Sequence, residues 1–425
     1  MDPFTLSTPV DLQCYPNYSF EVGDVDGDGR MEFAWLDTSA GLLRVKNLDN
    51  RTLFEKTLGN NGNWGTAPVC VADINHDGRC EIIVPDGPKV VVLDGAGRTL
   101  AEAVVGTSQR DVFGIGLPLL GTARVTPGGG LSMVATAAGG EVCALDASLN
   151  VLWKTGGFRR DFGHEIHFAD VDGDGLDEIA FCTVDNCNEG PGPANTGEFV
   201  LLDHDGKILL RKRVEDYIRD THFDDVAMAD FTGDGTTQIL LEKGFLIDLA
   251  GNVLWDLSKQ MEHGQWIAHA PAPEGKGRTA FISELWGGDG LKSLLFTGRG
   301  KVIRNLRGFP WPAFAEPNAD MARLPARAQT VRWDAKSAPE FFIPQQAVAW
   351  ENGHTCMKTR HFRLSGFFMD LRGNPTGEIH YDETRVEGFY YNGEVHSRVA
   401  DVDGDGRPEI VFPKNDGRVM MVKRG

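Results

Sequence analysis

The chain has 425 residues, of which 41% are hydrophobic and 24% are charged, as expected of a globular protein with a large buried core. Its formal net charge of −19 argues against a nucleic-acid partner, because phosphate binding requires a basic face. The sequence lacks the run of about 18 apolar residues that a membrane-spanning helix needs, so we expect no membrane partner.

The start of the chain and the cysteines carry little further information. Residues 1–6, MDPFTL, lack the basic start and apolar core of a signal peptide, and could be a remnant in front of a mature N-terminus. The seven cysteines are odd in number and irregularly spaced. Cys182 and Cys187 could pair, but most cysteines are interpreted as small buried hydrophobes.

An acidic loop with glycine at its sixth position recurs along the chain, and alternating apolar runs flank it. The clear copies are Asp24–Glu32, Asp73–Glu81, Asp170–Glu178 and Asp401–Glu409, and a degraded copy is Asp230–Gln238. Period-two alternation around a glycine-rich loop is typical of a β-hairpin. Each copy therefore predicts a strand, the loop and a second strand.

A second hairpin motif alternates with the acidic loops. It reads as a strand, a turn of the Asp-Gly type and a strand, at residues 90–100, 143–153, 200–210 and 245–255. One repeat thus contains four strands, and the 49 residues from Asp24 to Asp73 match the length of one propeller blade. No segment has sustained helical periodicity, so the sequence predicts an all-β propeller.

The number of blades follows from fainter copies of the acidic-loop pattern near Gly121, Pro271, Arg332 and Asp370. All copies together give nine, of which we take one faint copy as spurious. We therefore predict about eight four-stranded blades in a single domain spanning residues 1–425, with seven as the alternative. Because residues 418–425 end one strand short, we expect the N-terminal strand to complete the last blade and remove its exposed edge.

The acidic loops place oxygen ligands at positions 1, 3, 5 and 9, which suits calcium. An EF-hand delays its last acid to about position 12, whereas here that acid begins the next strand, so the ion would staple two strands. In the degraded copy Thr232 and Gln238 replace acids, and we expect weak binding or none. The predicted ligands are Asp24, Asp26, Asp28 and Glu32; Asp73, Asn75, Asp77 and Glu81; Asp170, Asp172, Asp174 and Glu178; and Asp401, Asp403, Asp405 and Glu409.

Several segments resemble the calcium-loop propellers of rhamnogalacturonan lyases, polysaccharide lyase family 11, and related rhamnose–uronate lyases. They are VGDVDGDGRMEFAW, VADINHDGRCEIIV, GHEIHFADVDGDGLDEIAF, THFDDVAMADFTGDG, AQTVRWDAKSAPEFF, ENGHTCMK and FFMDLRGNPTGEIHY. The chain is shorter than that family and lacks its N-terminal β-domain. The family's Asn-Gly-Thr-Lys run has an approximate counterpart from Asn352 to Lys358.

The resemblance implies a lyase that cleaves beside a uronic acid by β-elimination. Such an enzyme neutralises the carboxylate, removes the neighbouring proton and protonates the leaving oxygen. His164, His222 and His263 precede their acidic-loop positions by six to eight residues, which suggests histidines near one rim of the ring. The segment 354–363 is a local basic patch that suits an anionic sugar, in which Lys358 could be the base and Arg360 or Arg363 could hold the carboxylate.

The predicted catalytic residues are His164, His222, His263, Lys358 and His361, and the predicted substrate-binding residues are His354, Arg360, Arg363, His396 and Tyr390. The expected partner is an acidic polysaccharide, and we expect a monomer. The competing interpretation is a non-catalytic propeller of the integrin type, with FG-GAP-like repeats, that binds glycan or protein through the same face. Calcium loops fill where calcium is plentiful, which favours an extracellular or periplasmic location.

Overall fold

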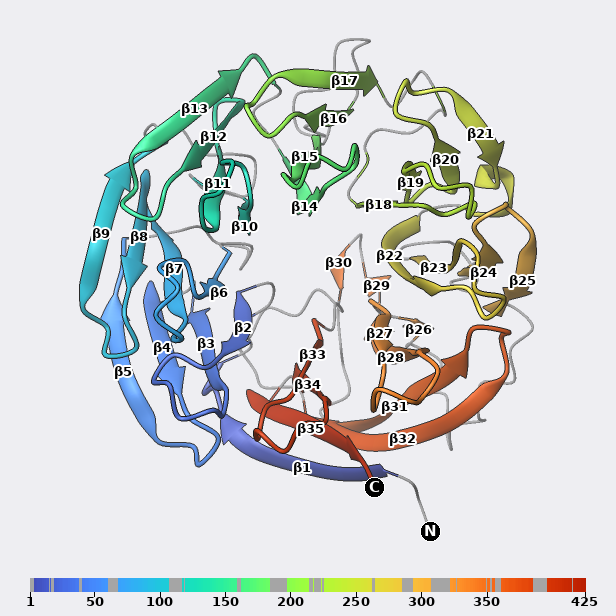
Figure 1. Cartoon of the computed structure of the whole chain (residues 1–425). Helices are drawn as coiled ribbons and strands as arrows, with labels where there is room; N and C mark the ends of the chain where they lie inside the picture. Colours follow the sequence, from blue (N-terminus) through green and yellow to red (C-terminus); the bar gives the residue numbers. More distant parts are fainter. Residues whose placement is uncertain are drawn as a thin grey trace.

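The computed structural model is a ring of eight antiparallel sheets, each a blade of a β-propeller (Figure 1). The residues that it describes are 4–14, 16, 19–37, 40–59, 68–106, 117, 119–158, 162–183, 197–213, 217, 223, 225–261, 264–284, 293–306, 322–325, 327–348, 350–351, 354–355, 361–384, 396–414 and 416–425. Among them the only helical element with assigned bounds is a 3-10 turn, η2 (Ser258–Gln260), and there is no α-helix. The prediction of an eight-bladed all-β propeller is confirmed.

The first four blades each contain four consecutive strands, ordered from the axis outward. Blade 1 contains β2 (Phe20–Gly23), β3 (Glu32–Asp37), β4 (Leu42–Lys46) and β5 (Thr52–Thr57). Blade 2 contains β6 (Cys70–Ala72), β7 (Glu81–Asp86), β8 (Lys89–Leu93) and β9 (Thr99–Val104). Blade 3 contains β10 (Leu120–Ala123), β11 (Ser132–Ala137), β12 (Glu141–Leu145) and β13 (Val151–Gly156). Blade 4 contains β14 (Phe162–Ala169), β15 (Glu178–Thr183), β16 (Glu198–Leu202) and β17 (Ile208–Arg213).

The remaining blades include two variations. Blade 5 contains β18 (Val226–Ala229), β19 (Gln238–Leu241), β20 (Phe245–Ile247) and β21 (Val253–Asp256). Blade 6 contains β22 (Gly264–Pro271), β23 (Arg278–Glu284), β24 (Leu294–Thr297) and β25 (Val302–Asn305). In blade 7 the inner strand is divided into β26 (Ala322–Pro325) and β27 (Gln329–Val331), followed by β28 (Glu340–Val348), β31 (His361–Asp370) and β32 (Pro375–Thr384). Blade 8 contains β33 (Arg398–Ala400), β34 (Glu409–Pro413), β35 (Arg418–Arg424) and, outermost, β1 (Phe4–Asp11).

Each acidic loop joins the innermost strand of a blade to the second strand, as the sequence predicts. The pairing register is the same in every case, since the residue before the loop pairs with the ninth loop position, as Gly23 does with Glu32. The faint copies near Gly121, Pro271 and Arg332 occupy the same place in blades 3, 6 and 7. The copy at Asp370 is the spurious one, because it forms the outer turn between β31 and β32.

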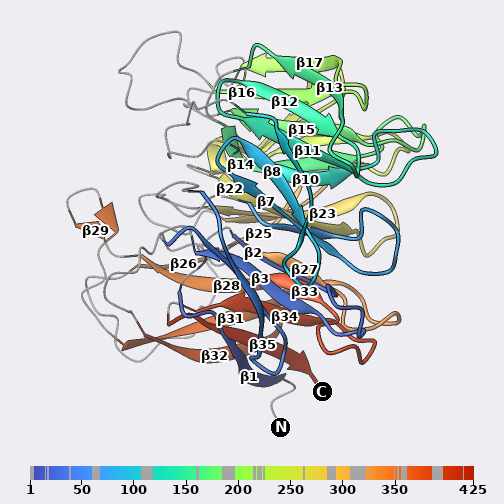
Figure 2. The same cartoon turned by 90° about the vertical axis from the view of Figure 1, so that its left-hand side faces the viewer.

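The antiparallel order divides the connections between two faces of the ring. The acidic loops and the outer turns lie on one face, which we call the loop face. The connections between second and third strands, and those between blades, lie on the opposite face. The hairpin of β29 (Trp350–Glu351) and β30 (His354–Thr355) is inserted between β28 and β31, so it belongs to the opposite face, where Figure 2 shows it projecting from the ring.

The hydrophobic core is divided into eight clusters, one between each pair of neighbouring blades. The second and third strands supply most of it because both of their faces are covered, as in β15, whose residues are all buried. Cys14 and Cys143 are buried within these clusters, and burial raises the pKa of the Cys14 thiol to about 12. Cys187 lies outside the described residues, so its pairing with Cys182 stays a prediction.

The N-terminal strand closes the ring, as expected. β1 pairs with β35 from Phe4↔Arg424 to Asp11↔Arg418, so the two ends of the chain complete one blade (Figure 1). Residues 4–6 are part of this strand, and the ring of Phe4 stacks on Phe368 of blade 7 at 4.2 Å between centroids. The closure therefore joins blade 8 to blade 7 through apolar contact as well as through backbone pairing.

We predict that Phe4→Ala destabilises the protein by about 3 kcal/mol, because a buried aromatic side chain is lost from the contact between blades 7 and 8. Urea unfolding measures the change. Leu6→Ala is the control, since Leu6 lies in the same strand but is 36% exposed, and it should change stability by less than about 0.5 kcal/mol. Equal effects of the two substitutions would contradict this account of the closure.

Candidate functional site

In the acidic loops, backbone N–H groups of the loop donate hydrogen bonds to the first aspartate and fix the shape of the loop. In blade 1, Asp24 accepts hydrogen bonds from the backbone N–H groups of Gly27 at 2.6 Å and Gly29 at 2.9 Å. The loop of blade 4 repeats these bonds on Asp170, at 2.7 Å and 3.0 Å. Gly29, at position 6, has a φ of 86°, which explains why glycine occupies the position.

The ninth loop position links the loop to the strand that follows it. Glu32 is 1% exposed, and its Oε2 accepts a hydrogen bond from the N–H of Val25 at 3.0 Å. The same bond to the second loop position recurs for Glu81, Glu178, Gln238 and Glu409. This carboxylate is buried among other acids, so it needs a positive partner as well as a hydrogen-bond donor.

The loops of blades 1 and 4 fit a calcium ion. In each loop, oxygens of the carboxylates at positions 1, 3 and 9 lie within 4.8 Å of one another. Oxygens that share one calcium at about 2.3–2.6 Å lie at most about 5 Å apart. The other oxygen of Glu178, Oε1, is buried and has no hydrogen-bond partner, so the loop contains an acceptor without a donor. Calcium binding itself stays a prediction.

Electrostatics also favour a cation in these two loops. Burial, together with the neighbouring aspartates, raises the pKa of Glu32 and of Glu178 to about 7, despite the backbone hydrogen bond that each accepts. In blade 4 two residues of the outer turn approach the same carboxylate, since atoms of Glu178, Asp203 and His204 also lie within 4.8 Å of one another. The blade-4 loop therefore gathers more donor groups than the blade-1 loop.

In blades 2 and 5 an amide replaces one of the acids. In blade 2, Asn75 donates from its Nδ2 to Glu81 at 2.7 Å, so calcium would require this amide to turn its oxygen inward. In blade 5, Gln238 donates from its Nε2 to the carbonyl of Thr236 at 2.6 Å and to Asp234 at 3.2 Å. The neutral amide of Gln238, at position 9, thus holds the blade-5 loop together without an ion.

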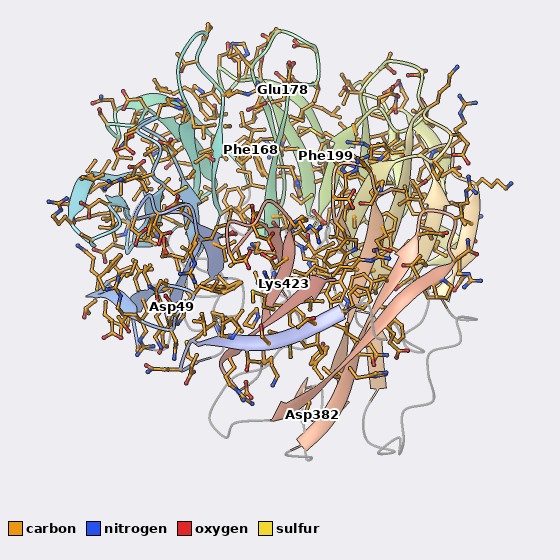
Figure 3. All side chains as sticks on the ribbon, turned by 60° about the horizontal axis from the view of Figure 1, so that its bottom comes forward. Asp49, Phe168, Glu178, Phe199, Asp382 and Lys423 are labelled. Atoms are coloured by element: carbon orange, nitrogen blue, oxygen red, sulfur yellow. The ribbon has the colours of Figure 1, made fainter. Side chains whose placement is uncertain are left out.

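In the loop of blade 8 the carboxylates of Asp401, Asp403 and Glu409 also lie within 4.8 Å of one another, but here a lysine enters the loop. The ammonium of Lys423 contacts the carboxylate of Asp403 and lies 3.2 Å from Glu409 and 3.7 Å from Asp405. Figure 3 shows Glu178 in the loops of blade 4, and Lys423 beside β1. The four complete acidic loops are therefore not equivalent.

A second group of charged residues lies on or directly beside the innermost strands around the propeller axis. It consists of Glu21, Glu165, His167, Asp225, Arg327 and Arg398, which we call the axial cluster. Arg327 of blade 7 pairs with Glu165 of blade 4, and these blades are not neighbours, so this ion pair crosses the axis. A polymer could not thread along the axis without breaking it.

The axial cluster joins neighbouring blades as well. His167 Nε2 lies 2.6 Å from Asp225 Oδ1, and Asp225 accepts hydrogen bonds from the N–H groups of Val226 and Ile267, both at 2.8 Å. These contacts connect blades 4, 5 and 6. Arg398 donates twice to Glu21, at 2.9 Å and 2.6 Å, which connects blade 8 to blade 1.

The cluster balances its charge when His167 is protonated, because three carboxylates then face two guanidiniums and one imidazolium. Burial lowers the pKa of His167, but the carboxylate of Asp225 outweighs burial and holds this pKa above its ordinary value. Burial likewise raises the pKa of Glu165, and Arg327 outweighs it, so the net pKa is lowered. Burial and the nearby cations Arg278 and His167 lower the pKa of His269 to about 3.

Most of the predicted catalytic and substrate-binding residues lie outside the described part. His222, His263, Lys358, Arg360 and Tyr390 are outside it entirely, and for His164, His354, His361 and Arg363 only the backbone is described. His164 lies near the start of β14, and His354 lies in β30. The structure does describe His396, which is 1% exposed and contacts the ring of Trp266 at 6.3 Å between centroids, a packing position.

Sequence reasoning missed the axial cluster, although the sequence contains a signal for it. Glu21, His167 and Arg398 each stand three residues before the first loop position of their blades. Glu165, Asp225 and Arg327 each stand five residues before it. Charged residues at two fixed distances, on strands that would otherwise be apolar, mark positions that face the axis.

Comparisons with known proteins agree on the fold. A profile of the FG-GAP-like repeat matches residues 24–84, which include the acidic loops of blades 1 and 2. A search of curated proteins finds no match. The solved structure of rhamnogalacturonan lyase YesW is similar at a TM-score of 0.59 and 19% identity, covering 99% of this chain and 72% of that one. The rhamnogalacturonan lyase PL11 of Bacillus licheniformis is similar at 0.57 and 18%, with the same coverage.

A solved structure that is not named as a lyase is equally similar in fold. Sqt1 of Saccharomyces cerevisiae is similar at a TM-score of 0.57 and 12% identity, covering 98% of both chains. Likeness at such identities shows the propeller alone. No helix in the described part of the chain is long and apolar enough to span a membrane.

We predict that His167 makes stability depend on pH. Since its folded pKa lies above the unfolded value of about 6.5, its contribution is complete below that pH and is lost as the pH rises through the folded pKa. The free energy of unfolding of the wild type should therefore exceed that of His167→Gln most at pH 6, and the gap should narrow towards pH 9.

The matched control for this titration is His269→Gln. His269 also lies on an inner strand, but its pKa of about 3 leaves it neutral across the whole range. Because His269 stays neutral in the folded protein but takes up a proton in the unfolded chain below about pH 6.5, the wild type should instead gain stability relative to His269→Gln as the pH rises from 6, the opposite direction to His167→Gln. A gap between wild type and His167→Gln that stays constant, or that moves in favour of the wild type as the pH rises, would show that folding does not raise the pKa of His167.

Proposed function

We propose that the protein is a polysaccharide lyase that cleaves a rhamnose-containing acidic glycan beside a uronic acid by β-elimination. The observation that supports this most is a difference among the comparisons. The two lyases reach 18–19% identity, whereas Sqt1 reaches 12% at the same similarity of fold. The lyase-like segments of the sequence also occur here in blades 1, 2, 4, 5, 7 and in the β29–β30 insertion.

The substrate would bind on the face opposite the loop face. The inner strands start there, His164 lies near the start of β14, and the basic segment 354–363 begins in the β29–β30 hairpin. The Glu165–Arg327 pair crosses the axis, so the glycan would lie across the ring and not pass through it. Lys358 or a histidine would remove the proton next to the uronate, and Arg360 or Arg363 would hold its carboxylate.

We propose a structural role for calcium, in the loops of blades 1 and 4 first and in blade 2 after a turn of the Asn75 amide. The ion would neutralise the buried carboxylates of Glu32 and Glu178 and join the inner two strands of each blade. Because such loops fill where calcium is plentiful, we infer an extracellular or periplasmic protein. We also propose that it acts as a monomer, since one ring provides the whole opposite face.

We predict that the protein, with calcium, raises the ultraviolet absorbance of rhamnogalacturonan, gum arabic or ulvan, because elimination leaves an unsaturated uronate. His164→Ala, His222→Ala or Lys358→Ala should abolish the rise if that residue carries the proton. His380→Ala is the control, since His380 lies in the outermost strand of blade 7 and should leave the rate unchanged. Glycan binding with no absorbance change on any substrate would favour the non-catalytic propeller instead.

We predict that a calcium chelator lowers the melting temperature and that added calcium restores it. An ion at about 100 times its Kd stabilises the folded state by about 2.7 kcal/mol per site. Glu178→Gln should reduce the calcium-dependent shift without preventing folding, because Gln238 already fills this position in blade 5. Glu102→Gln, in the exposed pair with Lys89, should leave the shift unchanged. A melting temperature that is indifferent to both chelator and calcium would contradict the proposed role.

A further inference from the structure

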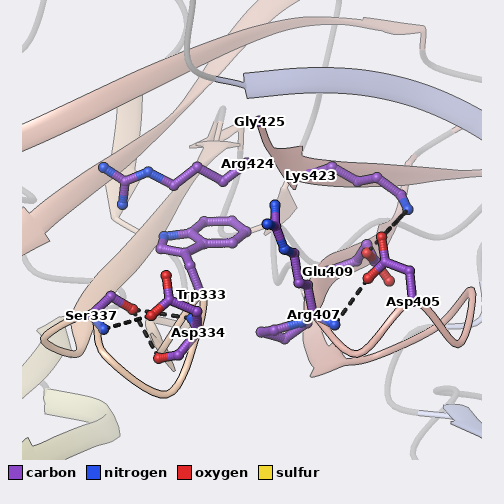
Figure 4. A pocket seen from close by; sticks show the side chains of 10 residues that line it. Trp333, Asp334, Ser337, Asp405, Arg407, Glu409, Lys423, Arg424 and Gly425 are labelled. Carbon is purple, nitrogen blue, oxygen red and sulfur yellow. Dashed lines mark hydrogen bonds and ion pairs between the residues drawn. The ribbon is translucent and has the colours of Figure 1, made fainter.

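Lys423 occupies the place in blade 8 that a cation would take in the other acidic loops. Its ammonium contacts carboxylates at loop positions 3, 5 and 9, namely Asp403, Asp405 and Glu409. Its side chain is 28% exposed, whereas that of Glu409 is 2% exposed. Figure 4 shows Lys423 extending from β35 towards Asp405, with Glu409 behind. A lysine has three N–H donors, enough for these three carboxylates.

The sheet register explains why only blade 8 has this lysine. In blades 1, 2 and 4 the third-strand residue nearest the ninth loop position is Asn47, Asp94 or Asp203, which follows the pairs Phe33↔Lys46, Ile82↔Leu93 and Ile179↔Leu202. That residue begins the outer turn, and in blade 2 Asp94 accepts hydrogen bonds from the N–H groups of that turn. In blade 8 the outermost strand is β1, so β35 enters no such turn, and Lys423 follows the pair Ile410↔Val422.

In blade 7 a cation also neutralises the ninth loop position, and this cation comes from the next residue of β35. Arg424 donates to Glu340, the ninth loop position of that blade, at 2.7 Å. The guanidinium lies 5.9 Å from the ring centroid of Trp333, and Figure 4 shows the two side chains next to each other. The Nε1 of Trp333 also donates to Glu340. Arg332 and Lys336 stand at loop positions 1 and 5, where the complete loops have aspartates. Two consecutive cations of β35 thus serve two neighbouring loops.

We propose that Lys423 is the built-in counter-ion of the blade-8 loop, so that this loop binds calcium more weakly than the loops of blades 1 and 4. The proposal rests on the calcium role proposed above for those two loops. A divalent ion among Asp401, Asp403 and Glu409 would have to displace the ammonium, because two cations within a few ångströms repel each other strongly. The position that favours calcium in the other blades is here held by the protein itself.

Lys423→Gln tests this proposal, because it removes the charge and keeps a side chain that can donate hydrogen bonds. At low free calcium, equilibrium dialysis with radioactive calcium should find one more ion per chain on Lys423→Gln than on the wild type. The added site should bind at least about tenfold more tightly than the wild-type loop does. Without calcium, Lys423→Gln should melt at a lower temperature than the wild type, and calcium should raise its melting temperature by more.

Two further variants separate the possible outcomes. Lys89→Gln removes a lysine–carboxylate pair at 3.0 Å outside the acidic loops and should leave calcium stoichiometry unchanged. Glu32→Gln should remove one ion, which tests the blade-1 site on its own. If the wild type and Glu32→Gln bind no calcium, the proposed calcium role fails, and the melting temperature of Lys423→Gln in chelator still tests the counter-ion. Equal stoichiometry and affinity in wild type and Lys423→Gln, or an unchanged melting temperature in chelator, would overturn the proposal.

Discussion

In six of the eight blades, the junction between the two inner strands depends on a buried carboxyl or amide group at the ninth position of the loop that joins them. In blade 1 this group is Glu32, which accepts a hydrogen bond from Val25 and so fixes where the loop ends and the second strand starts. The cost of burying a charge makes a positive or donating partner obligatory. The blades differ chiefly in which partner they provide, and under the calcium role proposed above that choice decides which loops would take a metal ion.

The solutions form a series across the ring. Blades 1 and 4 leave an acidic triad that suits calcium, blade 5 uses the neutral amide of Gln238, and blade 8 uses the ammonium of Lys423. Blade 7 uses Trp333 and Arg424 on Glu340. One backbone register accommodates all of them, since the pairing of the inner two strands is the same throughout. The repeats have therefore diverged in charge while conserving geometry within the chain.

Features that depend on neighbouring residues could be predicted from the sequence, whereas contacts between separate strands or blades could not. The acidic loops, the four-stranded repeat and the closing strand were predictable, because each depends on residues within about one blade's length or on an unpaired edge. The ninth copy, at Asp370, was misleading because an outer turn has the same Asp-and-Gly pattern as a loop. The Glu165–Arg327 pair spans 162 residues, so the sequence can mark each residue's place before its loop but not their pairing. Lys423 is only 20 residues from Asp403, but it reaches the loop from the third strand of the sheet, where no motif marks it. Of the predicted histidines, His164, His222 and His263 stand six to eight residues before their loops, whereas the charged residues that meet at the axis stand three and five before.

The ring closes only when the two ends of the chain pair with each other. β1 and β35 come from opposite ends of the chain, so pairing them orders the longest loop in the molecule. If the blade-8 loop depended on calcium, that pairing would depend on it too, because Lys423 lies directly opposite Thr5 of β1. With Lys423 and Arg424 as its cations, the closing blade carries its own counter-charges, and Phe4 packs against Phe368 regardless of the metal. Calcium can then stiffen blades 1 and 4 on the loop face while closure of the ring stays a property of the chain alone.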